Sequence, residues 1–570
     1  MNPLLLWSCA RGTAVLGAAL LLAVGCSAPA APPPAGGAPS GGGAPSNEPA
    51  KPKVDRVVLA VEQPTRESLE IRHMSTPNGW YLTPMHENLL GIDPETGKKI
   101  PRLAEKWTIE PSGKGVRFNL RKGVRFHGDW GDFTANDLPY QVEQDAKDDS
   151  LAGTTPFWRQ VSDGFDIVNE YEIVYKLKQS NGNFMDYVSD QLGGLEVTSK
   201  KAFDKSGPAT EATGPIPGTG PYQFMERKEG QFARYKRVAY KHWRITPDFP
   251  EFEYRFVKEA STRLAALLAG EVHLTALSED LLQQATKQGM ATVKGRVPAL
   301  RTFINFYCCA ANNPKEYSLG YLDPESPLMN VKVRTALSKA INRDELNKGF
   351  FAGKGATLIN NPLNAQRIGW NPDWEKRFPD EYGFDVAKAK QLLVDAGFGP
   401  SNPAKITMIL QITPGLQASQ DIAEAVANYW RNIGVNVALE QIDAVTAAAQ
   451  NRAGKLTRHT WVQATNSNQW VGIYNFGTGY GRLPGVVGGS GPETEEIDRH
   501  LITIANTLDE KKIEEAWRAE GEALFSTHKF VPLFWLPVEV AVNPKIVSDW
   551  VLPGSISGSF THAEYIKAAK

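Results

Sequence analysis

The chain has 570 residues, more than one compact core usually supports, so we expect at least two lobes. Apolar residues make up 42% and charged residues 22%, a balance typical of a globular protein rather than a disordered one. The 62 Lys and Arg residues nearly equal the 63 Asp and Glu residues, which argues against a nucleic-acid-binding protein with its usual basic excess.

The first 25 residues have the pattern of a secretory signal peptide. Arg11 supplies a positive charge, and residues 13–24 then form an uncharged apolar run that is too short to span a bilayer as a helix. The run ends in Leu-Ala-Val-Gly-Cys, which resembles a bacterial lipobox with Cys26 as the lipidated residue. The alternative is an ordinary cleavage site that happens to contain a cysteine.

Residues 26–53 are rich in Pro, Gly and Ala and contain almost no bulky apolar side chain. Such a stretch cannot bury enough surface to offset its ordering entropy, which predicts a flexible tether. Acyl chains on Cys26 would hold the protein stably on a membrane. The sequence therefore predicts an extracytoplasmic domain that is anchored to a membrane, not embedded in it.

The first half of the folded part reads as strand-rich. Residues 57–61 predict a buried strand, and residues 116–120 and 171–177 alternate apolar and polar side chains with the period of a half-exposed strand. Lys122-Gly123 predicts a turn after the second of these strands.

The second half changes to helical spacing. Residues 333–341 carry an apolar stripe, and Asn342 with Glu345 resembles a capping box that opens another helix. Asp385 predicts the cap of a helix that Gly397 ends. A further helix is expected to end at Gly434, and a strand follows it. A helix, a terminating glycine and a strand in this order are typical of an α/β layer.

Several blocks resemble, in order, the family 5 (peptide/nickel-type) extracellular solute-binding proteins of ABC importers. These blocks are residues 86–107, 118–127, 218–222, 263–272, 330–346, 387–398 and 530–535. The resemblance covers nearly the whole chain after residue 57. The chain departs from it at residues 126–129, where Phe-His-Gly-Asp replaces the usual Phe-His-Asp-Gly.

The resemblance implies an α/β, two-lobed periplasmic-binding-protein-like fold (type II, cluster C) with an extra strand-rich subdomain. By that pattern the first lobe comprises residues 54–92, 195–300 and 530–570, the inserted subdomain residues 93–194, and the second lobe residues 301–529. The implied function is capture of a small ligand between hinged lobes by a monomer that delivers it to the membrane permease.

A second departure affects the expected ligand. Peptide-binding members carry an aspartate near a tryptophan in the second lobe, where it pairs with the free amine of the peptide. The corresponding stretch here, residues 460–470, contains no acid, and none occurs between Asp443 and Glu493. Because a buried ammonium without a counter-charge is costly, amine anchoring at this place is disfavoured unless another acid such as Glu62 or Glu87 substitutes.

Aromatic and amide side chains in this region are the expected ligand contacts instead. They suit capped or modified peptides, other peptide-like solutes or oligosaccharides, and packing of the aromatic residues in the core is the alternative. The candidate ligand-binding residues are Trp80, Tyr81, Arg458, Trp461, Asn466, Asn468, Trp470 and Tyr474.

The sequence gives little support to catalysis or metal binding. The nine histidines lack metal-ligand spacing, no nucleophile elbow or phosphate loop is present, and no cofactor is expected. Adjacent Cys308 and Cys309 do not predict a disulfide framework. A secreted lipoprotein hydrolase of peptides or glycans remains the rival interpretation, although the acid-free stretch argues against a carboxylate pair there.

Overall fold

A computed structural model of the chain describes residues 52–64, 67–73, 76–190, 194–296, 300–307, 310–312, 319–321, 323–413, 416, 418–443, 446–447, 449–450, 455–465, 469, 494–552 and 560–570. Residues 49–570 form one compact unit. The signal peptide, Cys26 and most of the tether lie outside the described residues, as do Cys308 and Cys309.

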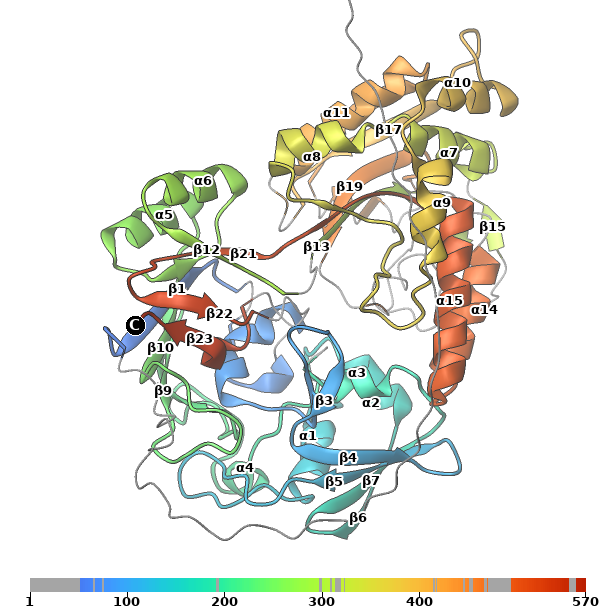
Figure 1. The fold of residues 1–570 in the computed structure, drawn as a ribbon. Coiled ribbons are helices and arrows are strands. Elements are labelled where there is room, and N and C mark those ends of the chain that lie inside the picture. Colours follow the sequence, from blue (N-terminus) through green and yellow to red (C-terminus); the bar gives the residue numbers. More distant parts are fainter. Residues whose placement is uncertain are drawn as a thin grey trace, which may run out of the picture. The chain divides into compact units, whose positions relative to one another are not determined.

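The first large sheet has, among the described residues, seven strands in the order β12-β21-β11-β1-β10-β9-β8. Strands β1, β10 and β11 run parallel, whereas β9 and β21 are antiparallel to their neighbours. Apolar side chains of β1 pack against helices α5 and α6, which lie side by side in Figure 1. The elements are β1 (Arg56–Val61), β8 (Tyr222–Lys228), β9 (Phe232–Arg237), β10 (Glu251–Phe256), α5 (Ala260–Ala269), β11 (Leu274–Thr275), α6 (Glu279–Lys287), β12 (Ala291–Lys294) and β21 (Glu539–Val542).

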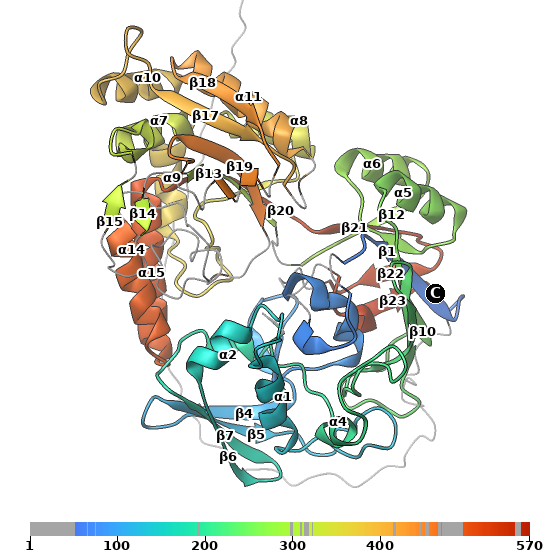
Figure 2. The same ribbon diagram turned by 180° about the vertical axis from the view of Figure 1, so that it is seen from behind.

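The second large sheet has the described order β16-β20-β13-β19-β17-β18. Helices α7, α10 and α11 cover one of its faces, and Figure 2 shows α11 alongside β17 and β18. The elements are β13 (Leu300–Tyr307), α7 (Val331–Lys339), α8 (Arg343–Phe351), β16 (Ala356–Thr357), α9 (Asp373–Tyr382), α10 (Val386–Asp395), β17 (Lys405–Leu410), α11 (Ser419–Asn432), β18 (Asn436–Gln441), β19 (His459–Thr465), α14 (Thr494–Ala505), α15 (Glu510–Thr527) and β20 (Phe530–Leu536).

A smaller four-stranded sheet, β4-β5-β7-β6, has its own buried cluster with α1 and α2. Leu508, from the α14–α15 connection, is buried in the same cluster. The elements are β4 (Ala104–Ile109), β5 (Gly115–Leu120), α1 (Asp137–Asp145), α2 (Thr155–Val161), β6 (Ser162–Asn169), β7 (Glu172–Leu177) and α3 (Phe184–Tyr187).

Short elements complete the described part of the chain. The remaining strand pairs are β2 (Leu90–Ile92) with β3 (Lys99–Pro101), β14 (Ala310–Asn312) with β15 (Leu319–Tyr321), and β22 (Val547–Trp550) with β23 (Ile566–Ala568). The remaining helices are α4 (Lys200–Ser206) and the 3-10 helices η1 (Ile71–His73), η2 (Thr76–Met85), η3 (Pro327–Met329) and η4 (Ala563–Tyr565).

The helix caps and the helix-ending glycine predicted from the sequence are confirmed. The Asn342 side chain caps α8 by accepting from the backbone N–H of Glu345, and Asp385 caps α10 in the same way through Lys388. Gly434, with a φ of 96°, follows α11 and leads into β18. The left-handed conformation explains the glycine there, because other residues adopt it at a cost.

One expected boundary differs from the strand pairing. The resemblance places residues 530–570 in the first lobe, but β20 pairs with β13 and β16 in the second sheet. Only β21, after residue 538, enters the first sheet. Every residue of β20 is buried, so its continuous apolar sequence does not reveal which sheet it joins.

Candidate functional site

Two chain segments cross between the large sheets, and they lie next to each other. One runs from β12 to β13 and the other from β20 to β21. The backbone N–H of Gly295 in the first donates to the carbonyl of Val538 in the second at 2.8 Å. Two short adjacent connections of this kind form a hinge about which the two α/β units can rotate.

The strands that adjoin these crossovers present a mixed polar and aromatic face. Ile304 and Phe306 of β13 point into the core beneath α7 and α11, so Arg301, Phe303 and Asn305 project from the opposite face. In the strand register Arg301 lies opposite Thr465 of β19 and Trp535 of β20.

Two guanidinium groups lie against the indole ring of Trp535. The Cζ of Arg301 is 5.7 Å and the Cζ of Arg367 is 5.4 Å from the ring centroid. Arg301 is fully buried, whereas Arg367 is partly exposed and donates from Nη1 to the Pro362 carbonyl at 2.8 Å. Both distances fall within the range of a cation–π contact.

The electrostatics of this stack follow from burial and like charge. Burial, and secondly the neighbouring Arg367, hold the pKa of Arg301 well below its usual value. Burial also lowers the pKa of Arg367 to about 10, although the Asp186 carboxylate opposes part of this shift. Asp186 belongs to α3, and Phe184 of the same helix is buried in the cluster of the four-stranded sheet.

The segment that carries Arg367 also holds buried amides. Asn360 and Asn361 have no exposed surface, and neither polar side-chain atom of Asn361 has a hydrogen-bond partner in the described part of the chain. Gln469 donates from Nε2 to the Ile368 carbonyl at 2.7 Å. This bond connects the acid-free stretch of residues 460–470 to the segment that carries Arg367. An unpaired buried amide is costly, so such groups are candidates for contact with a ligand or water.

The structure places two of the predicted contacts, Trp80 and Tyr81, within the packing of the first lobe. Trp80 is 7% exposed and meets the ring of Tyr254 edge to face, with centroids 4.9 Å apart. Tyr81 is fully buried, and its hydroxyl accepts from the backbone N–H of Ser68 at 2.7 Å. Burial raises the pKa of Tyr81 above its usual value. Their role as ligand contacts stays a prediction.

Two other predicted contacts lie on β19 or directly before it. Arg458 pairs with Asp323 through contacts of 2.5 and 3.0 Å, at the end of β19 that lies far from the crossovers. Trp461 is partly buried and packs with Ile409 and Leu456. The structure does not bring Arg458 to the Trp535 stack, and Asn466, Asn468, Trp470 and Tyr474 lie outside the described residues.

The two acids considered as substitutes for the missing aspartate differ in their surroundings. Glu87 is buried and accepts from Arg244 Nε at 3.0 Å, Trp243 Nε1 at 3.1 Å and the Thr219 hydroxyl at 3.1 Å. Its charge is therefore balanced inside the protein. Glu62 is well exposed, and one of its carboxylate oxygens is 3.8 Å from Arg263.

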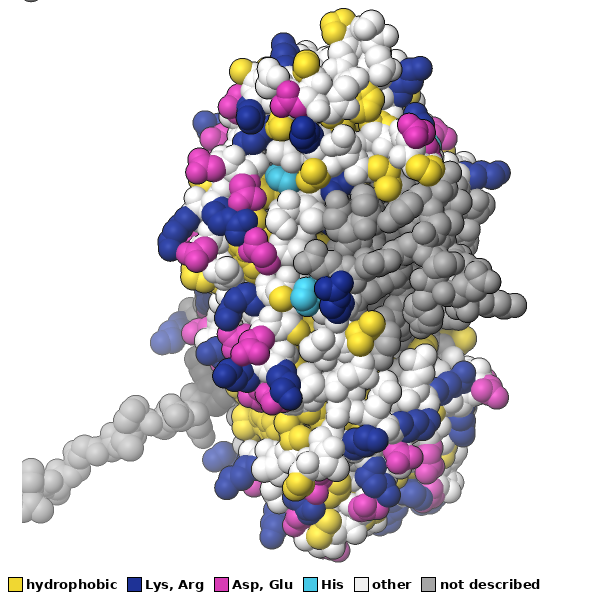
Figure 3. Space-filling view, turned by 90° about the vertical axis from the view of Figure 1, so that its right-hand side faces the viewer, with side chains coloured by type: hydrophobic (Ala, Val, Ile, Leu, Met, Phe, Trp, Pro, Cys, Tyr) yellow, Lys and Arg dark blue, Asp and Glu magenta, His cyan; other side chains and the backbone are white. Residues whose placement is uncertain are grey.

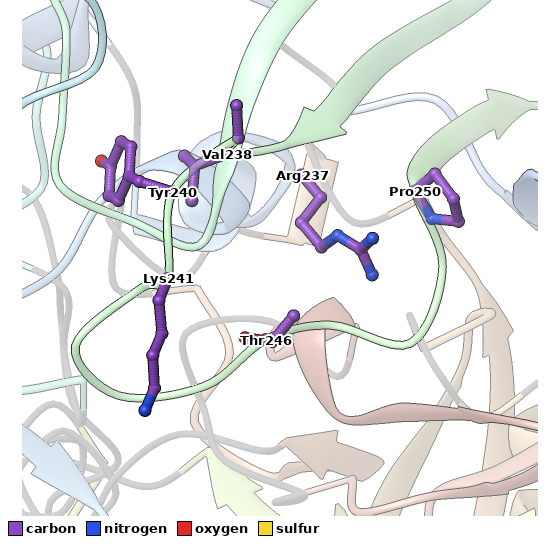
Figure 4. A pocket seen from close by; sticks show the side chains of 7 residues that line it. Arg237, Val238, Tyr240, Lys241, Thr246 and Pro250 are labelled. Atoms are coloured by element: carbon purple, nitrogen blue, oxygen red, sulfur yellow. The ribbon is translucent and has the colours of Figure 1, made fainter. Parts of the chain in front are cut away.

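A pocket of about 330 Å³ lies elsewhere, at the β9–β10 connection. In Figure 4 the Arg237 side chain extends toward the part of the connection that holds Thr246 and Pro250. The backbone N–H of Arg237 donates to the Pro250 carbonyl, and this bond lies beside the start of β1. The crossovers leave the sheet at the opposite end, beyond the carboxyl end of β1. This pocket is therefore not positioned for capture between the lobes.

The described ranges contain neither a candidate metal site nor a candidate membrane-spanning helix. No group of three or more His, Cys, Asp or Glu residues there could hold a metal ion. No described helix is both long and apolar enough to cross a membrane. On the face in Figure 3 basic and acidic side chains are interspersed over the described surface.

Comparisons with known proteins identify a family and a fold. The sequence profile of the bacterial extracellular solute-binding proteins, family 5, matches residues 98–482. The dipeptide-binding protein of Escherichia coli is 25% identical over 62% of this chain and 65% of its own length. The heme-binding protein A of Haemophilus influenzae is 28% identical over 59% of this chain and 60% of its own length. The matches thus span less than two thirds of these two relatives.

Solved structures match more completely. The periplasmic binding protein DppA from Helicobacter pylori, in complex with the peptide STSA, has a TM-score of 0.64 at 19% identity, covering 90% of this chain and 98% of its own. The substrate-binding protein CtaP from Listeria monocytogenes has a TM-score of 0.70 at 16% identity and covers 90% and 99%. These likenesses establish the two-lobed α/β fold.

Proposed function

Because the chain belongs to the bacterial extracellular solute-binding proteins of family 5, we propose that it captures a small solute between its lobes and delivers it unchanged to an ABC-importer permease. The observation that supports this most is the pair of adjacent crossovers between two separate sheets. A hinge of this kind permits closure on a ligand, and the closed form can be recognised by a partner. The protein then needs no catalytic group.

We propose peptides or peptide-like solutes as the first ligand class and oligosaccharides as the second. Relatives in the comparison are described as binding dipeptides, heme or the peptide STSA. The acid-free stretch after Asp443 and its aromatic and amide residues support ligands without a free-amine requirement.

The proposed division into lobes follows the expected ranges with one change. The inserted subdomain comprises residues 93–194 and the second lobe begins at residue 301, but the second lobe extends through β20 to Leu536. The remaining C-terminal segment, from β21 onward, then belongs to the first lobe.

We further propose that Cys26 carries the lipid and that residues 27–53 form the tether of a monomer outside the cytoplasmic membrane. Cys26→Ser should abolish incorporation of a labelled fatty acid and release the protein from membranes. Incorporation that persists in Cys26→Ser would contradict this assignment.

The test of function is ligand-dependent stabilisation without turnover. The full chain in mild detergent is screened by thermal shift against dipeptides, oligopeptides and oligosaccharides. A ligand at about 1,000 times its Kd should add about 4 kcal/mol to the free energy of unfolding. Small-angle scattering should show contraction on binding, and mass spectrometry should recover the ligand intact. Sustained conversion of the ligand to products would overturn the proposal.

A further inference from the structure

Lys354 connects the part of the chain around the second sheet to the part around the first, beside the crossovers. Its Nζ lies 2.8 Å from Oε2 of Glu279 in α6 and 2.8 Å from Oε2 of Glu539 at the start of β21. We propose that these three residues, the crossover latch, stabilise the open arrangement of the lobes and separate when the lobes close on a ligand. This inference rests on the proposed function and adds a control on its affinity.

The backbone at Lys354 is held by its own half of the molecule. The backbone N–H of Lys354 donates to the Phe351 carbonyl of α8 at 2.9 Å. The backbone N–H and carbonyl of Gly355 both bond to the side chain of Asn347, at 2.9 and 2.7 Å. Strand β16 begins at the next residue and pairs with β20. Lys354 therefore moves with the second sheet.

The two carboxylates have further partners in the other half. Glu539 lies opposite Lys294 of β12 in the strand register, and the Lys294 Nζ is 3.1 Å from its second carboxylate oxygen. Glu279 is the first residue of α6, where negative charge is favourable, and accepts from Gln283 Nε2 at 3.1 Å. Both carboxylates thus keep a partner when Lys354 leaves, which limits the free energy needed to open the latch.

The latch lies on the side of the crossovers that faces away from the four-stranded sheet. Figures 1 and 2 both show α6 and α8 on one side of the β20–β21 connection, and α15 and α2 on the other. Arg367, which lies against Trp535 of β20, interacts electrostatically with Asp186 of α3, so the polar and aromatic face of β13 and β20 is on the α2 side. A rotation that closes this face on a ligand therefore moves Lys354 away from α6.

The strength of the latch follows from its partial burial. The side chains of Lys354, Glu279 and Glu539 are 28%, 25% and 9% exposed. Salt screens such a group less than a surface pair, but the attraction still weakens as ionic strength rises. An interaction made only in the open arrangement lowers the fraction of molecules that are ready to close, and so raises the apparent Kd. Removal of the latch should therefore tighten binding.

The experiment measures affinity for the full chain in mild detergent. Calorimetric titrations with trialanine and with maltotriose compare the wild-type protein, Lys354→Met and Lys354→Arg. We expect Lys354→Met to bind roughly 3- to 10-fold more tightly, as for loss of one partly buried ion pair, and Lys354→Arg to stay close to wild type. Between about 0.05 M and about 0.5 M NaCl, the wild-type affinity should rise toward that of Lys354→Met, because salt screens the latch.

Lys376→Met is the control, because Lys376 is exposed on α9 and pairs with Asp373 of the same helix. A cooperative melt close to that of wild type establishes that each variant is folded. Small-angle scattering with contrast-matched detergent should show that ligand-free Lys354→Met is more contracted than the wild-type protein and the control.

If Lys354→Met changes neither the affinity nor the contraction, or if it weakens binding, the inference is overturned and the solute-binding function stays intact. Failure of both probes to bind counts against the proposed ligand classes instead. The scattering comparison without ligand then decides the latch by itself, since equal dimensions of Lys354→Met and wild type contradict it.

Discussion

Glu87 is a buried carboxylate in the first lobe, and its partners determine its protonation. Burial raises its pKa, but the charge of Arg244 and the contact with His242 outweigh this, and the pKa falls to about 2 from an ordinary 4.5. Arg244 also donates to Glu564 at 2.9 Å and to the Tyr565 hydroxyl at 3.0 Å, so the network joins distant segments of the chain.

Glu87→Gln should lower the free energy of unfolding at pH 7 by about 3 kcal/mol, because the difference in pKa between folded and unfolded states is lost. A carboxylate with a depressed pKa stabilises the fold fully above its unfolded value, near 4.5, and this contribution disappears as the pH falls through about 2. Urea unfolding at pH 7 and pH 3 measures the free energy of unfolding of the wild-type protein and of Glu87→Gln. The difference between the two proteins should be smaller at pH 3.

Glu514→Gln is the matched control, because Glu514 is an exposed carboxylate with an (i, i+4) partner on α15. Its effect should stay below about 1 kcal/mol. If Glu87→Gln lowers the free energy of unfolding no more than the control does, or lowers it more at pH 3 than at pH 7, the charge of Glu87 does not stabilise the fold as expected.

Three residues that meet in the structure are not among the contacts predicted from the sequence. Arg301, Arg367 and Trp535 come from distant parts of the chain and meet only through the register of β13 with β20 and the path of residues 358–370. A signal was present, because Arg301 is the one charged residue of a strand that is otherwise neutral and mostly apolar. Trp80 and Tyr81 illustrate the reverse problem, since an aromatic pair next to an expected cleft packs equally well into a core.

At the scale of elements, helix boundaries were the most predictable feature because their causes are local. Asp385 accepts from the backbone N–H of Lys388 at 2.8 Å, and this bond depends only on residues three apart. The membership of β20 was not predictable, since pairing partners are set by tertiary structure and a strand buried on both faces has no polar side to orient it.

The α10 cap gives a direct test of this local control. Asp385→Ala should reduce the free energy of unfolding by about 1 kcal/mol, because the capped N–H group loses its acceptor. Asp395→Ala, at the opposite end of the same helix, is the comparison, and its change should be within about 0.5 kcal/mol. Chemical denaturation measures the decrease in free energy of unfolding for both variants. Equal decreases would show that the side chain of Asp385 stabilises the helix no more than that of Asp395.

At the scale of the molecule, the buried cluster of the four-stranded sheet contacts the α14–α15 connection. The backbone N–H of Gly182 donates to the Ile504 carbonyl at 3.1 Å, and Leu508 is buried among the apolar side chains of the subdomain. A methyl group on Gly182 would lie only 2.3 Å from the Ile504 oxygen. This close backbone approach explains why glycine occupies the position.

Gly182→Ala should therefore separate residues 504–508 from the subdomain and destabilise the protein by about 1–3 kcal/mol. Faster hydrogen exchange at residue 182 and around Leu508 would report the separation. Gly349→Ala, on α8 with open space around it, should instead be neutral or stabilising by up to about 1 kcal/mol. Unchanged exchange in Gly182→Ala would show that the contact is not required.

The position of β21 has a consequence for biosynthesis. This strand lies between β12 and β11, yet it is made after the entire second lobe. If the chain is exported from its N-terminal end, a chain that has emerged from the membrane as far as Leu536 contains all the described strands of the second sheet, whereas its first sheet lacks an interior strand. We therefore expect the second lobe to acquire protease resistance during export, and the first lobe only once Val542 has emerged.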